Sequence, residues 1–333
     1  MSIKIAINGF GRIGRMTLRS IIENKRKDIE IVAINNRSNA EISSFLLSHD
    51  TIHGPLKNKI NYSSQSISVD GKEISMIQES EIADIDWKKY KIDVVLECTG
   101  KFNSKEKSSL HIKSGAKKVL VSAPCKGATN IVFGVNHKNI NSKDKIISAA
   151  SCTTNCLAPV AKVLNDSFKI ERGFMTTIHS YTTDQRLLDN SHKDLRRARA
   201  ATNSMIPTTT GATKSLGDVI PDLKDKVEGI SIRVPTPNVS LVEFVFNSNK
   251  NLTVKEINNS FIKASKSSLK NVLDVNTKPL VSSDFNHNPH SAIVDLSLTK
   301  VVENKMAKVS AWYDNEWGFA SRMCDLAKYF AKI

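Results

Sequence analysis

The chain has 333 residues, of which 40% are hydrophobic and 24% charged, and it carries a formal net charge of +15 at pH 7. This length predicts about two domains with a substantial buried core. No apolar run is long enough to cross a bilayer, and the N-terminal residues indicate a strand rather than a signal peptide, so we expect a cytoplasmic protein without a membrane partner.

The excess of positive charge raises the question of a nucleic-acid partner. The lysines are dispersed singly and in pairs such as Lys88-Lys89 and Lys117-Lys118, without a basic helix or an aromatic-basic alternation. We therefore expect no dedicated nucleic-acid function, and we expect the positive field to favour phosphorylated substrates.

The first 150 residues alternate strand and helix signals, which is typical of a doubly wound parallel sheet with crossover helices. Strands are expected at residues 3–7, 29–34, 93–98 and 118–122, and a helix at residues 12–23. We expect residues 1–150 to form an α/β domain.

The first predicted strand leads into Gly9-Phe10-Gly11-Arg12-Ile13-Gly14, a complete G-x-G-x-x-G motif in the strand-turn-helix context of dinucleotide sites. Gly9 permits the tight turn, Gly11 lets backbone amides approach a pyrophosphate, and Gly14 lets the helix pack closely on the strand. We therefore predict that this segment, including Arg12 and Ile13, binds a dinucleotide cofactor.

A cysteine opens a predicted helix at the start of the second region. Ser151 is a good N-cap, and Cys152 is followed by apolar residues at helical spacing. A thiol in the first turn of a helix feels the positive end of the helix dipole, which lowers its pKa and favours the nucleophilic thiolate. Cys156, four residues along, would allow a redox pair, but we interpret it as a core residue. The five cysteines are scattered without paired spacing, which indicates neither a disulfide framework nor a metal site.

Residues 151–315 contain long strand signals with few helices between them. Strands are expected at residues 173–177, 229–234, 241–247, 291–296 and 308–312. This pattern predicts an α+β catalytic domain built on a mixed, largely antiparallel sheet. Helical periodicity at residues 316–331 predicts a C-terminal helix, within 316–333, that packs back onto the first domain.

Four motifs of this chain carry a family resemblance. They are Asn8-Gly9-Phe10-Gly11-Arg12-Ile13-Gly14-Arg15, Ala150-Ser151-Cys152-Thr153-Thr154-Asn155-Cys156-Leu157-Ala158-Pro159, His179-Ser180-Tyr181-Thr182 and Tyr313-Asp314-Asn315-Glu316-Trp317-Gly318. Together they resemble phosphorylating glyceraldehyde-3-phosphate dehydrogenase, and the resemblance covers essentially the whole chain. It implies an N-terminal Rossmann domain that binds NAD or NADP, a homotetramer, and oxidation of glyceraldehyde 3-phosphate with inorganic phosphate to 1,3-bisphosphoglycerate.

The chemistry implied by the resemblance requires a nucleophile and a base. An aldehyde gives up hydride efficiently only after a nucleophile has made it tetrahedral, and a thiolate leaves an energy-rich thioester after the oxidation. Cys152 fits this role. His179 follows a strand-like run, and the family motif assigns it as the base that holds the thiol deprotonated and takes the hydroxyl proton.

The resemblance also implies two phosphate sites made of hydroxyl, amide and guanidinium donors. The residues expected to hold inorganic phosphate are Ser151, Thr153, Thr210 and Gly211. The residues expected to hold the phosphate of the substrate are Thr182, Arg197 and Arg233.

The cofactor contacts implied by the resemblance include Ser122 and Asn315. Asn315 matches the residue that grips the nicotinamide carboxamide and fixes which face of the ring meets the substrate. The nearby aromatic residues Tyr313 and Trp317 are interpreted as packing residues.

Two departures from the family pattern concern cofactor choice. NAD-specific sites place an acidic residue after the second strand, where it repels a 2′-phosphate, but this chain has Asn36 followed by Arg37. NAD-specific members commonly carry Leu-Pro before the His-Lys-Asp stretch, whereas Asn190 and Ser191 stand there in this chain. Both departures predict use of NADP as well as NAD. In the alternative interpretation, Asn36 bonds the ribose of NAD and Arg37 points to solvent.

Two other functions stay open at this point. A related dehydrogenase of the same fold acts on erythrose 4-phosphate, and such an enzyme would bind inorganic phosphate poorly. A basic RNA-binding protein on an inherited dehydrogenase scaffold is the non-enzymatic alternative. The intact set of Cys152, His179, Arg233 and Asn315 argues against it, because a scaffold released from catalysis has no physical need for that constellation.

Overall fold

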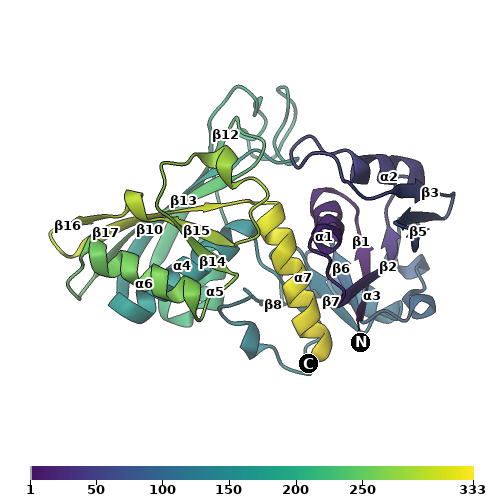
Figure 1. Cartoon of the computed structure of the whole chain (residues 1–333), viewed down its shortest axis with the longest axis horizontal. Coiled ribbons are helices and arrows are strands. Elements are labelled where there is room, and N and C mark those ends of the chain that lie inside the picture. Colours follow the sequence, from purple (N-terminus) through teal and green to yellow (C-terminus); the bar gives the residue numbers. More distant parts are fainter. Residues whose placement is uncertain (1) are drawn as a thin grey trace. The chain divides into compact units, whose positions relative to one another are not determined.

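The computed structural model describes residues 2–333, in which the chain forms two compact units. The first unit contains the residues up to Ile131, together with His137–Ala150 and Ala320–Ile333. The second unit contains Val132–Asn136 and Ser151–Phe319. Each unit is built on its own β-sheet (Figure 1).

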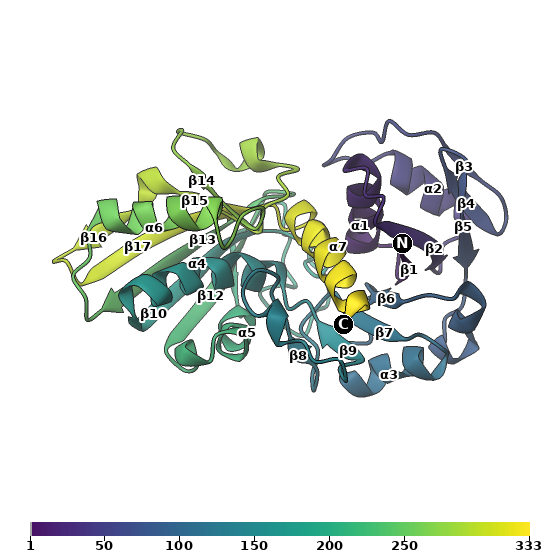
Figure 2. The ribbon, with the colours of Figure 1, turned by 60° about the horizontal axis from the view of Figure 1, so that its bottom comes forward.

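Within residues 2–333, the sheet of the first unit has nine strands in the order β3-β4-β5-β2-β1-β6-β7-β9-β8. The strands are β1 (Ile3–Asn8), β2 (Ile29–Asn35), β3 (Ile60–Tyr62), β4 (Ser66–Val69), β5 (Lys72–Ile77), β6 (Val94–Glu97), β7 (Lys118–Val121), β8 (Thr129–Asn130) and β9 (Ile146–Ser148). The helices are α1 (Arg12–Glu23), α2 (Ala40–Ser48), α3 (Lys105–Lys113) and the greater part of α7 (Trp317–Lys332). Figure 2 shows α1 and α3 on opposite faces of this sheet.

The core of this sheet is parallel. β1 pairs in parallel with β2 and β6, and parallel pairing continues to β5 on one side and to β7 and β9 on the other. Central strands covered on both faces need near-continuous apolar runs, which is the pattern of the sequence. The predicted doubly wound α/β fold is therefore confirmed. The β3, β4 and β5 strands form an antiparallel edge that the sequence pattern did not predict.

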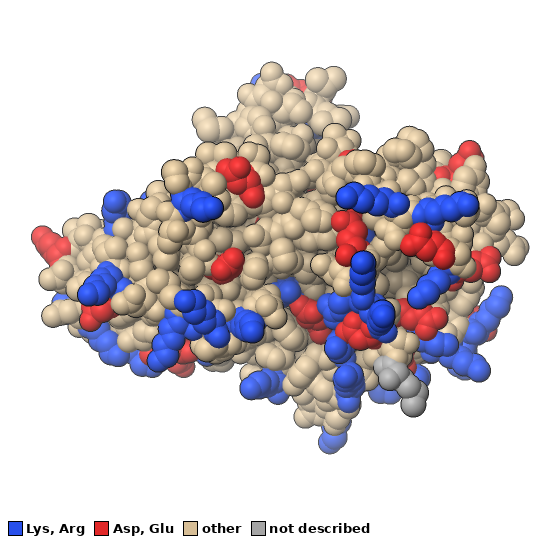
Figure 3. Space-filling model, viewed as in Figure 1, with Lys and Arg blue, Asp and Glu red and all other residues tan. Residues whose placement is uncertain are grey.

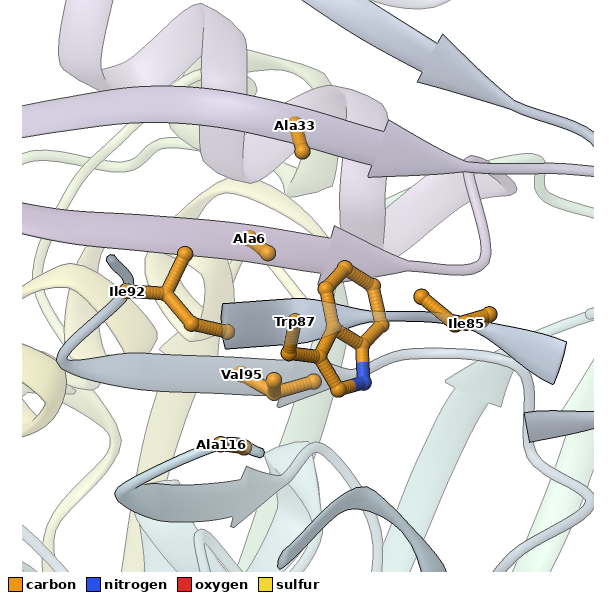
Figure 4. Close-up of a cluster of buried hydrophobic side chains, with 7 residues drawn as sticks. All are labelled: Ala6, Ala33, Ile85, Trp87, Ile92, Val95 and Ala116. Atoms are coloured by element: carbon orange, nitrogen blue, oxygen red, sulfur yellow. The ribbon is translucent and has the colours of Figure 1, made fainter. Parts of the chain in front are cut away.

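One large aromatic side chain fills the space against this sheet. Trp87 is fully buried in a cluster with Ala6, Ala33, Ile92 and Val95 (Figure 4). The small side chains of Ala6 and Ala33 on neighbouring strands leave room for the indole, so the volumes of the two layers are complementary.

A buried polar cluster ties two strand ends together. Glu97, at the end of β6, is 1% exposed, and its Oε2 accepts from Asn8 Nδ2 at 2.6 Å and from His111 Nε2 at 3.0 Å. Trp87 Nε1 donates to His111 Nδ1 at 3.1 Å, so the imidazole carries its proton on Nε2 and donates it to Glu97. Glu97 Oε1 accepts from Thr99 N at 2.7 Å. These donors replace the water that the buried carboxylate has lost.

The second unit contains a mixed sheet whose described strands run β11-β12-β10-β13-β17-β15-β14, with β16 paired to β17. The strands are β10 (Ile170–Ser180), β11 (Ile206–Thr208), β12 (Val227–Val234), β13 (Ser240–Ser248), β14 (Leu273–Asn276), β15 (Ala292–Asp295), β16 (Lys300–Val302) and β17 (Met306–Tyr313). Only β10–β12 and β14–β15 pair in parallel among these strands. This arrangement confirms the predicted mixed, largely antiparallel sheet.

Helices cover one face of the second sheet (Figure 2). They are α4 (Cys152–Phe168), α5 (Ala212–Val219) and α6 (Val254–Lys266). Along β13, buried residues such as Val242 and Phe244 alternate with half-exposed ones such as Glu243 and Val245. The same alternation along β10 and β12 gives an outer face on which apolar and polar side chains lie together. The apolar ones are Phe174, Ile178, Ile230, Ile232, Leu241 and Val245, and Thr176, Glu228 and Glu243 lie among them.

The glycine turn after β1 yields a test of local packing. A Cβ on Gly14 would lie 2.2 Å from the carbonyl oxygen of Gly9 and 3.1 Å from the Ile7 side chain. Gly14→Ala must therefore shift backbone, and we expect it to destabilise the protein by about 1–3 kcal/mol in urea unfolding.

The matched control for this variant is Gly11→Ala. Gly11 has a φ of −75°, and a Cβ there meets no atom of residues 2–333 within 4 Å. This variant should lose less than about 1 kcal/mol of stability. Equal stability of the two variants would contradict the packing argument.

Candidate active site

The first turn of α4 is positioned by its own sequence. Ser151 is the N-cap, and its Oγ accepts from the backbone N of Thr154 at 3.1 Å. Ala150, just before the cap, has a φ of +56°, in the left-handed region that an L-residue adopts only at a cost. This bend carries the chain out of β9 and into the helix within three residues, so that Cys152 occupies the first helical position.

Cys152 lies next to the predicted base. Its Sγ is 3.5 Å from His179 Nε2, and His179 is 2% exposed near the end of β10. His179 Nδ1 lies 2.7 Å from the carbonyl oxygen of Ser180. When Nδ1 donates its proton to that carbonyl, the lone pair of Nε2 faces the thiol and is available to accept its proton.

The electrostatics of the pair differ from the sequence-based expectation. Burial raises the pKa of the Cys152 thiol, and the charge of Arg233 and hydrogen bonds from Thr153 oppose this rise only in part. Burial and the charge of Arg233 lower the pKa of His179 to about 3. The helix N-terminus is expected to lower the pKa of the thiol, but loss of hydration outweighs the helix dipole and raises that pKa instead. Both groups are therefore neutral in this structure, and the thiol faces the imidazole at Nε2.

Strand pairing places the predicted phosphate ligand Arg233 beside the base. β10 and β12 run parallel, and their register sets His179 opposite Arg233. Arg233 Nη1 is 2.9 Å from His179 Nδ1 and 3.1 Å from the Ser180 carbonyl oxygen. Arg233 Nε is buried and has no hydrogen-bond partner in the part of the chain that the structure describes. A buried guanidinium with a free donor is suited to bind an anion.

Tyr313 has a larger role than the packing role that the sequence suggested. Its OH forms hydrogen bonds with Thr153 Oγ1 at 3.0 Å and with Thr177 Oγ1 at 2.8 Å. Its ring also meets the His179 ring edge to face, with centroids 5.9 Å apart. Tyr313 therefore holds both the first turn of α4 and the imidazole in place.

The second predicted arginine already has anionic and polar partners. Arg197 Nη1 contacts Asp184 at 2.5 Å, Nε donates to Thr208 Oγ1 at 2.9 Å, and Nη2 donates to the carbonyl oxygen of Thr209 at 3.2 Å. The charge of Arg197 acts on both His179 and Arg233, so the two arginines and the pair of Cys152 and His179 share one electrostatic site. Asp184 was missed in the sequence, where an isolated acid in a polar loop carries no distinctive signal.

The remaining predicted phosphate ligands lie at the ends of loops. Thr182 follows β10, and its N and Oγ1 both reach Gln185 Oε1, at 2.9 and 3.2 Å. Thr210 Oγ1 accepts from Ala212 N at 3.2 Å, and Gly211 is the N-cap of α5. Since Arg197 bonds the backbone of Thr209, it lies beside the start of α5.

Asn315 lies in the loop between β17 and α7 and is 5% exposed. Its Oδ1 accepts from the hydroxyls of Ser180 and Ser240, both at 2.9 Å. Its Nδ2 has no hydrogen-bond partner among residues 2–333. An amide donor this deeply placed and without a protein partner is suited to a ligand.

The predicted cofactor residues of the first unit meet at the glycine turn. Gly9 has a φ of +93°, and a Cβ there would lie 2.7 Å from the backbone N of Thr99. Gly11 caps α1 without a side-chain hydrogen bond to the described helix, so no side chain covers its first N–H groups. Ile13 belongs to the first turn of the helix.

Arg12 is oriented by an acidic partner. Its guanidinium forms a two-pronged ion pair with the buried Asp50. Burial opposes ionisation of that carboxyl, but the charge of Arg12 and the N–H groups of His53 and Ile52 outweigh it and lower the pKa of Asp50 to about 2. The Arg12 head group is thereby held at the start of α1.

The residues predicted to set cofactor choice occupy two places. Asn36, after β2, donates from Nδ2 to Ser43 Oγ at 3.2 Å, while the side chain of Arg37 is exposed and makes no bond to the described residues. Ser122 follows β7, and its N donates to the Glu97 carbonyl oxygen at 3.0 Å. Ser191 is exposed in the loop of the second unit, where its carbonyl oxygen accepts from Arg186.

Residues 2–333 contain neither a membrane-spanning helix nor a cluster of metal ligands. No helix there is long and apolar enough to span a membrane. No group of His, Cys, Asp and Glu side chains in that part is arranged to hold a metal ion.

On the face drawn in Figure 3, Lys and Arg lie among Asp and Glu side chains rather than in one continuous field.

Comparison with known proteins adds to this geometry. Residues 3–105 match the family model described as the NAD binding domain of glyceraldehyde 3-phosphate dehydrogenase, and residues 151–315 match the model of its C-terminal domain. The chain is 52% identical to glyceraldehyde-3-phosphate dehydrogenase of Cereibacter sphaeroides and 50% identical to that of Xanthobacter flavus, over the full length of each chain. It is 49% identical to glyceraldehyde-3-phosphate dehydrogenase 2 of Bacillus subtilis, over 99% of this chain and 97% of the relative. The chain belongs to the glyceraldehyde-3-phosphate dehydrogenase family.

Proposed function

We propose that this protein oxidises glyceraldehyde 3-phosphate with a nicotinamide cofactor and inorganic phosphate to 1,3-bisphosphoglycerate. The observation that carries the proposal is the contact of 3.5 Å between Cys152 Sγ and His179 Nε2, with Arg233 directly beside the imidazole. A nucleophile, a base and a buried cation within one site are what the oxidation of a phosphorylated aldehyde requires.

In the proposed reaction, Cys152 forms the bond to carbon and His179 carries the protons. The Cys152 thiol passes its proton to His179 Nε2 as the sulfur adds to the aldehyde carbon, and the imidazolium returns that proton to the resulting alkoxide to give a hemithioacetal. His179 then accepts the hydroxyl proton of that adduct as hydride leaves, and Cys152 retains the acyl group as a thioester. Attack of inorganic phosphate on the thioester releases the product and restores the thiolate. Tyr313 keeps the imidazole and Thr153 in register through these steps.

Two groups of side chains support two phosphate positions. Arg233 and Thr182, near the ends of β12 and β10, would hold the substrate phosphate together with Arg197. Ser151, Thr153, Thr210 and Gly211, at the helix starts of α4 and α5, would hold inorganic phosphate. The N–H groups at a helix start favour an anion, and buried guanidinium groups favour it further.

The glycine turn fits a dinucleotide. The position of Gly11 has open space where a Cβ would stand, and α1 begins without a side-chain cap in the described residues, which leaves N–H groups for a pyrophosphate. When bound, NAD or NADP supplies the hydride acceptor. Arg12, held by Asp50 in the first unit, and Asn315, in the second unit, are each proposed as a donor to that cofactor.

We propose that the cofactor site accepts NADP as well as NAD. The neutral Asn36 carries no charge to repel a 2′-phosphate, and Arg37 is an exposed cation next to it. In the second unit, Ser191 presents a small hydroxyl where NAD-specific members carry proline. These three positions support dual use, with Ser122 as a further cofactor contact.

A homotetramer is proposed for the assembly. Apolar side chains on the outer face of the second sheet are exposed to water, with Phe174 51% and Ile230 40% exposed. The loop that carries Arg197 adds further exposed apolar side chains, namely Leu187, Leu188, Leu195 and Met205. A self-complementary apolar face supports symmetric association of identical chains.

Inorganic phosphate separates the proposal from the erythrose 4-phosphate alternative. The phosphorylating reaction stops without inorganic phosphate, whereas an enzyme that hydrolyses its thioester does not need it. Steady-state rates on both aldehydes, with and without phosphate, decide between the two. Retention of the fold but absence of turnover on either aldehyde would favour the RNA-binding alternative.

Removal of the nucleophile and of the base should have different effects. Cys152→Ser should lose nearly all dehydrogenase activity and keep cofactor binding, because a serine hydroxyl is scarcely ionised at neutral pH. His179→Asn should lower kcat by about 10²–10⁴-fold. Since the thiolate is the species that iodoacetamide alkylates, loss of its proton acceptor should also move the rise in alkylation rate to higher pH. An unchanged alkylation profile would refute the role of His179 as acceptor.

Arg233→Ala should act mainly on the substrate phosphate. A hydrogen bond to a charged group is worth about 1.5–3 kcal/mol, so kcat/KM for glyceraldehyde 3-phosphate should fall about 10- to 150-fold more than that for glyceraldehyde. Comparison of the two substrates cancels the effect of the variant on His179. Thr210→Ala is the control, since it should weaken inorganic phosphate instead. Equal losses on both aldehydes would make Arg233 a structural residue.

Asn36→Asp should depress the use of NADP selectively. In the native protein Asn36 Nδ2 donates to Ser43 Oγ, whereas the new carboxylate would accept from the Ser43 hydroxyl. It places a negative charge against the 2′-phosphate, at a cost of about 1–2 kcal/mol in a partly hydrated site. Catalytic efficiency with NADP should therefore fall about 5- to 30-fold relative to NAD. If the native protein already rejects NADP by several orders of magnitude, the dual-use proposal is wrong.

A further inference from the structure

The side-chain amide of Asn315 has one occupied end and one free end. Its Oδ1 receives two hydroxyl hydrogen bonds, from Ser180 and Ser240, and its Nδ2 has no partner among the described residues. Ser180 and Ser240 are 0% and 1% exposed, so water does not satisfy their hydroxyl groups. The two serines come from different strands, Ser180 from the end of β10 and Ser240 from the start of β13.

The two hydroxyls decide which way the amide faces. Ser240 Oγ already accepts from the backbone N of Ser180 at 3.1 Å, so its own proton must find another acceptor. That acceptor is Oδ1 of Asn315, which is also the acceptor for Ser180 Oγ. With the amide reversed, both hydroxyl protons would be buried without an acceptor, at a cost of about 1–3 kcal/mol for each group. The serines therefore hold Oδ1 inward and leave the two protons of Nδ2 for a ligand.

The backbone on both sides of this contact is also held. Asp314 Oδ2 accepts from Asn238 Nδ2 at 2.8 Å and from His287 N at 2.7 Å, while its Oδ1 accepts from Trp317 N at 2.7 Å. Asp314 immediately precedes Asn315, and its bond to Asn238 connects it to the loop before Ser240. The acceptors and donors of this cluster all come from the second unit.

The residue before Ser240 has a strained backbone. Val239 is β-branched and has a φ of +64°, a conformation that costs about 1–3 kcal/mol. It is kept there by packing against Phe285 and Ile293. Strain of this kind persists only where the surrounding packing leaves the residue no other conformation. The strained conformation of Val239 sets the start of β13, where the Ser240 hydroxyl bonds Asn315.

We propose that Ser180 and Ser240 are positioning residues that select the orientation of the Asn315 amide and so present Nδ2 to the carboxamide oxygen of a nicotinamide ring. The inference rests on the proposed function, because it requires a nicotinamide cofactor. The serines themselves do not touch the ring. Their removal lets the amide rotate, so that it can present Oδ1, an acceptor, to the carboxamide oxygen, which is also an acceptor.

The test compares a ligand that carries the ring with one that lacks it. NAD and ADP-ribose are titrated calorimetrically into the native protein, Ser180→Ala and Ser240→Ala. Loss of one oriented hydrogen bond should weaken NAD about 3- to 10-fold, and ADP-ribose should change less than about twofold. The matched control is Ser231→Ala, since Ser231 is a buried strand serine whose Oγ has no partner within residues 2–333. It should leave both affinities unchanged.

A double-mutant cycle separates positioning from general damage to the strand ends. In an Asn315→Ala background, Ser180→Ala should cause no further loss of NAD affinity, because the group that it orients is gone. Equal losses for NAD and ADP-ribose, or a loss that persists in that background, would overturn the inference. If the native protein oxidises the substrate but the serine variants bind NAD with the native affinity, the inference is wrong and the proposed function stands. If the native protein binds neither NAD nor NADP, the proposed function fails and the inference fails with it.

Discussion

The contact between the Cys152 thiol and the His179 imidazole is the interaction on which the rest of the site depends. It joins the first residue of α4 to the end of β10. The contact therefore requires that the helix begin at Cys152 and that the strand extend to His179. The Ser151 cap and the left-handed Ala150 set the first condition. The pairing of β10 with β12 and β13 sets the second, and the same register brings Arg233 to the imidazole.

Burial gives this contact its chemical character. In a dehydrated site, neither a thiolate nor an imidazolium is stable by itself. Cys152 is therefore a neutral thiol and His179 a neutral imidazole until a bound acceptor or anion changes their pKa values. Arg233 and Arg197 provide positive charge that disfavours protonation of His179 and attracts phosphate. The positive charge that disfavours the imidazolium is thus the charge that a bound phosphate would neutralise. The site is arranged for a phosphorylated substrate before one binds.

Polar side chains buried at strand ends recur in both units. In the first unit, Glu97 gathers Asn8, Thr99 and His111 beside the glycine turn. In the second, Asp314 and Asn315 gather donors from four segments, those of Ser180, of Asn238 and Ser240, of His287, and of Trp317. Such clusters are costly if any member is left unsatisfied, and they fix one geometry when all are satisfied. Their position at strand ends places that rigidity where ligands bind in sheets of this kind.

The sequence by itself determined the elements whose signals are local. The glycine motif predicts both the turn and the helix Arg12–Glu23, because its spacing, the preceding apolar strand and the amphipathic period all lie within about twenty residues. The hydroxyl-rich segment around Cys152 predicts the start of α4 for the same reason. Helix α6 was missed, although Thr253 and Glu256 form a capping pair there, because the prediction relied on strand signals in this region.

Only the tertiary structure decided which distant residues meet. The register that sets His179 beside Arg233, the ion pair of Arg197 with Asp184, and the two serines on Asn315 join residues up to 135 positions apart, and no local pattern encodes such pairings. The pKa of Cys152 is a second case. The helix position visible in the sequence lowers it, but the extent of burial raises it, and burial is a property of the whole packed unit rather than of any segment.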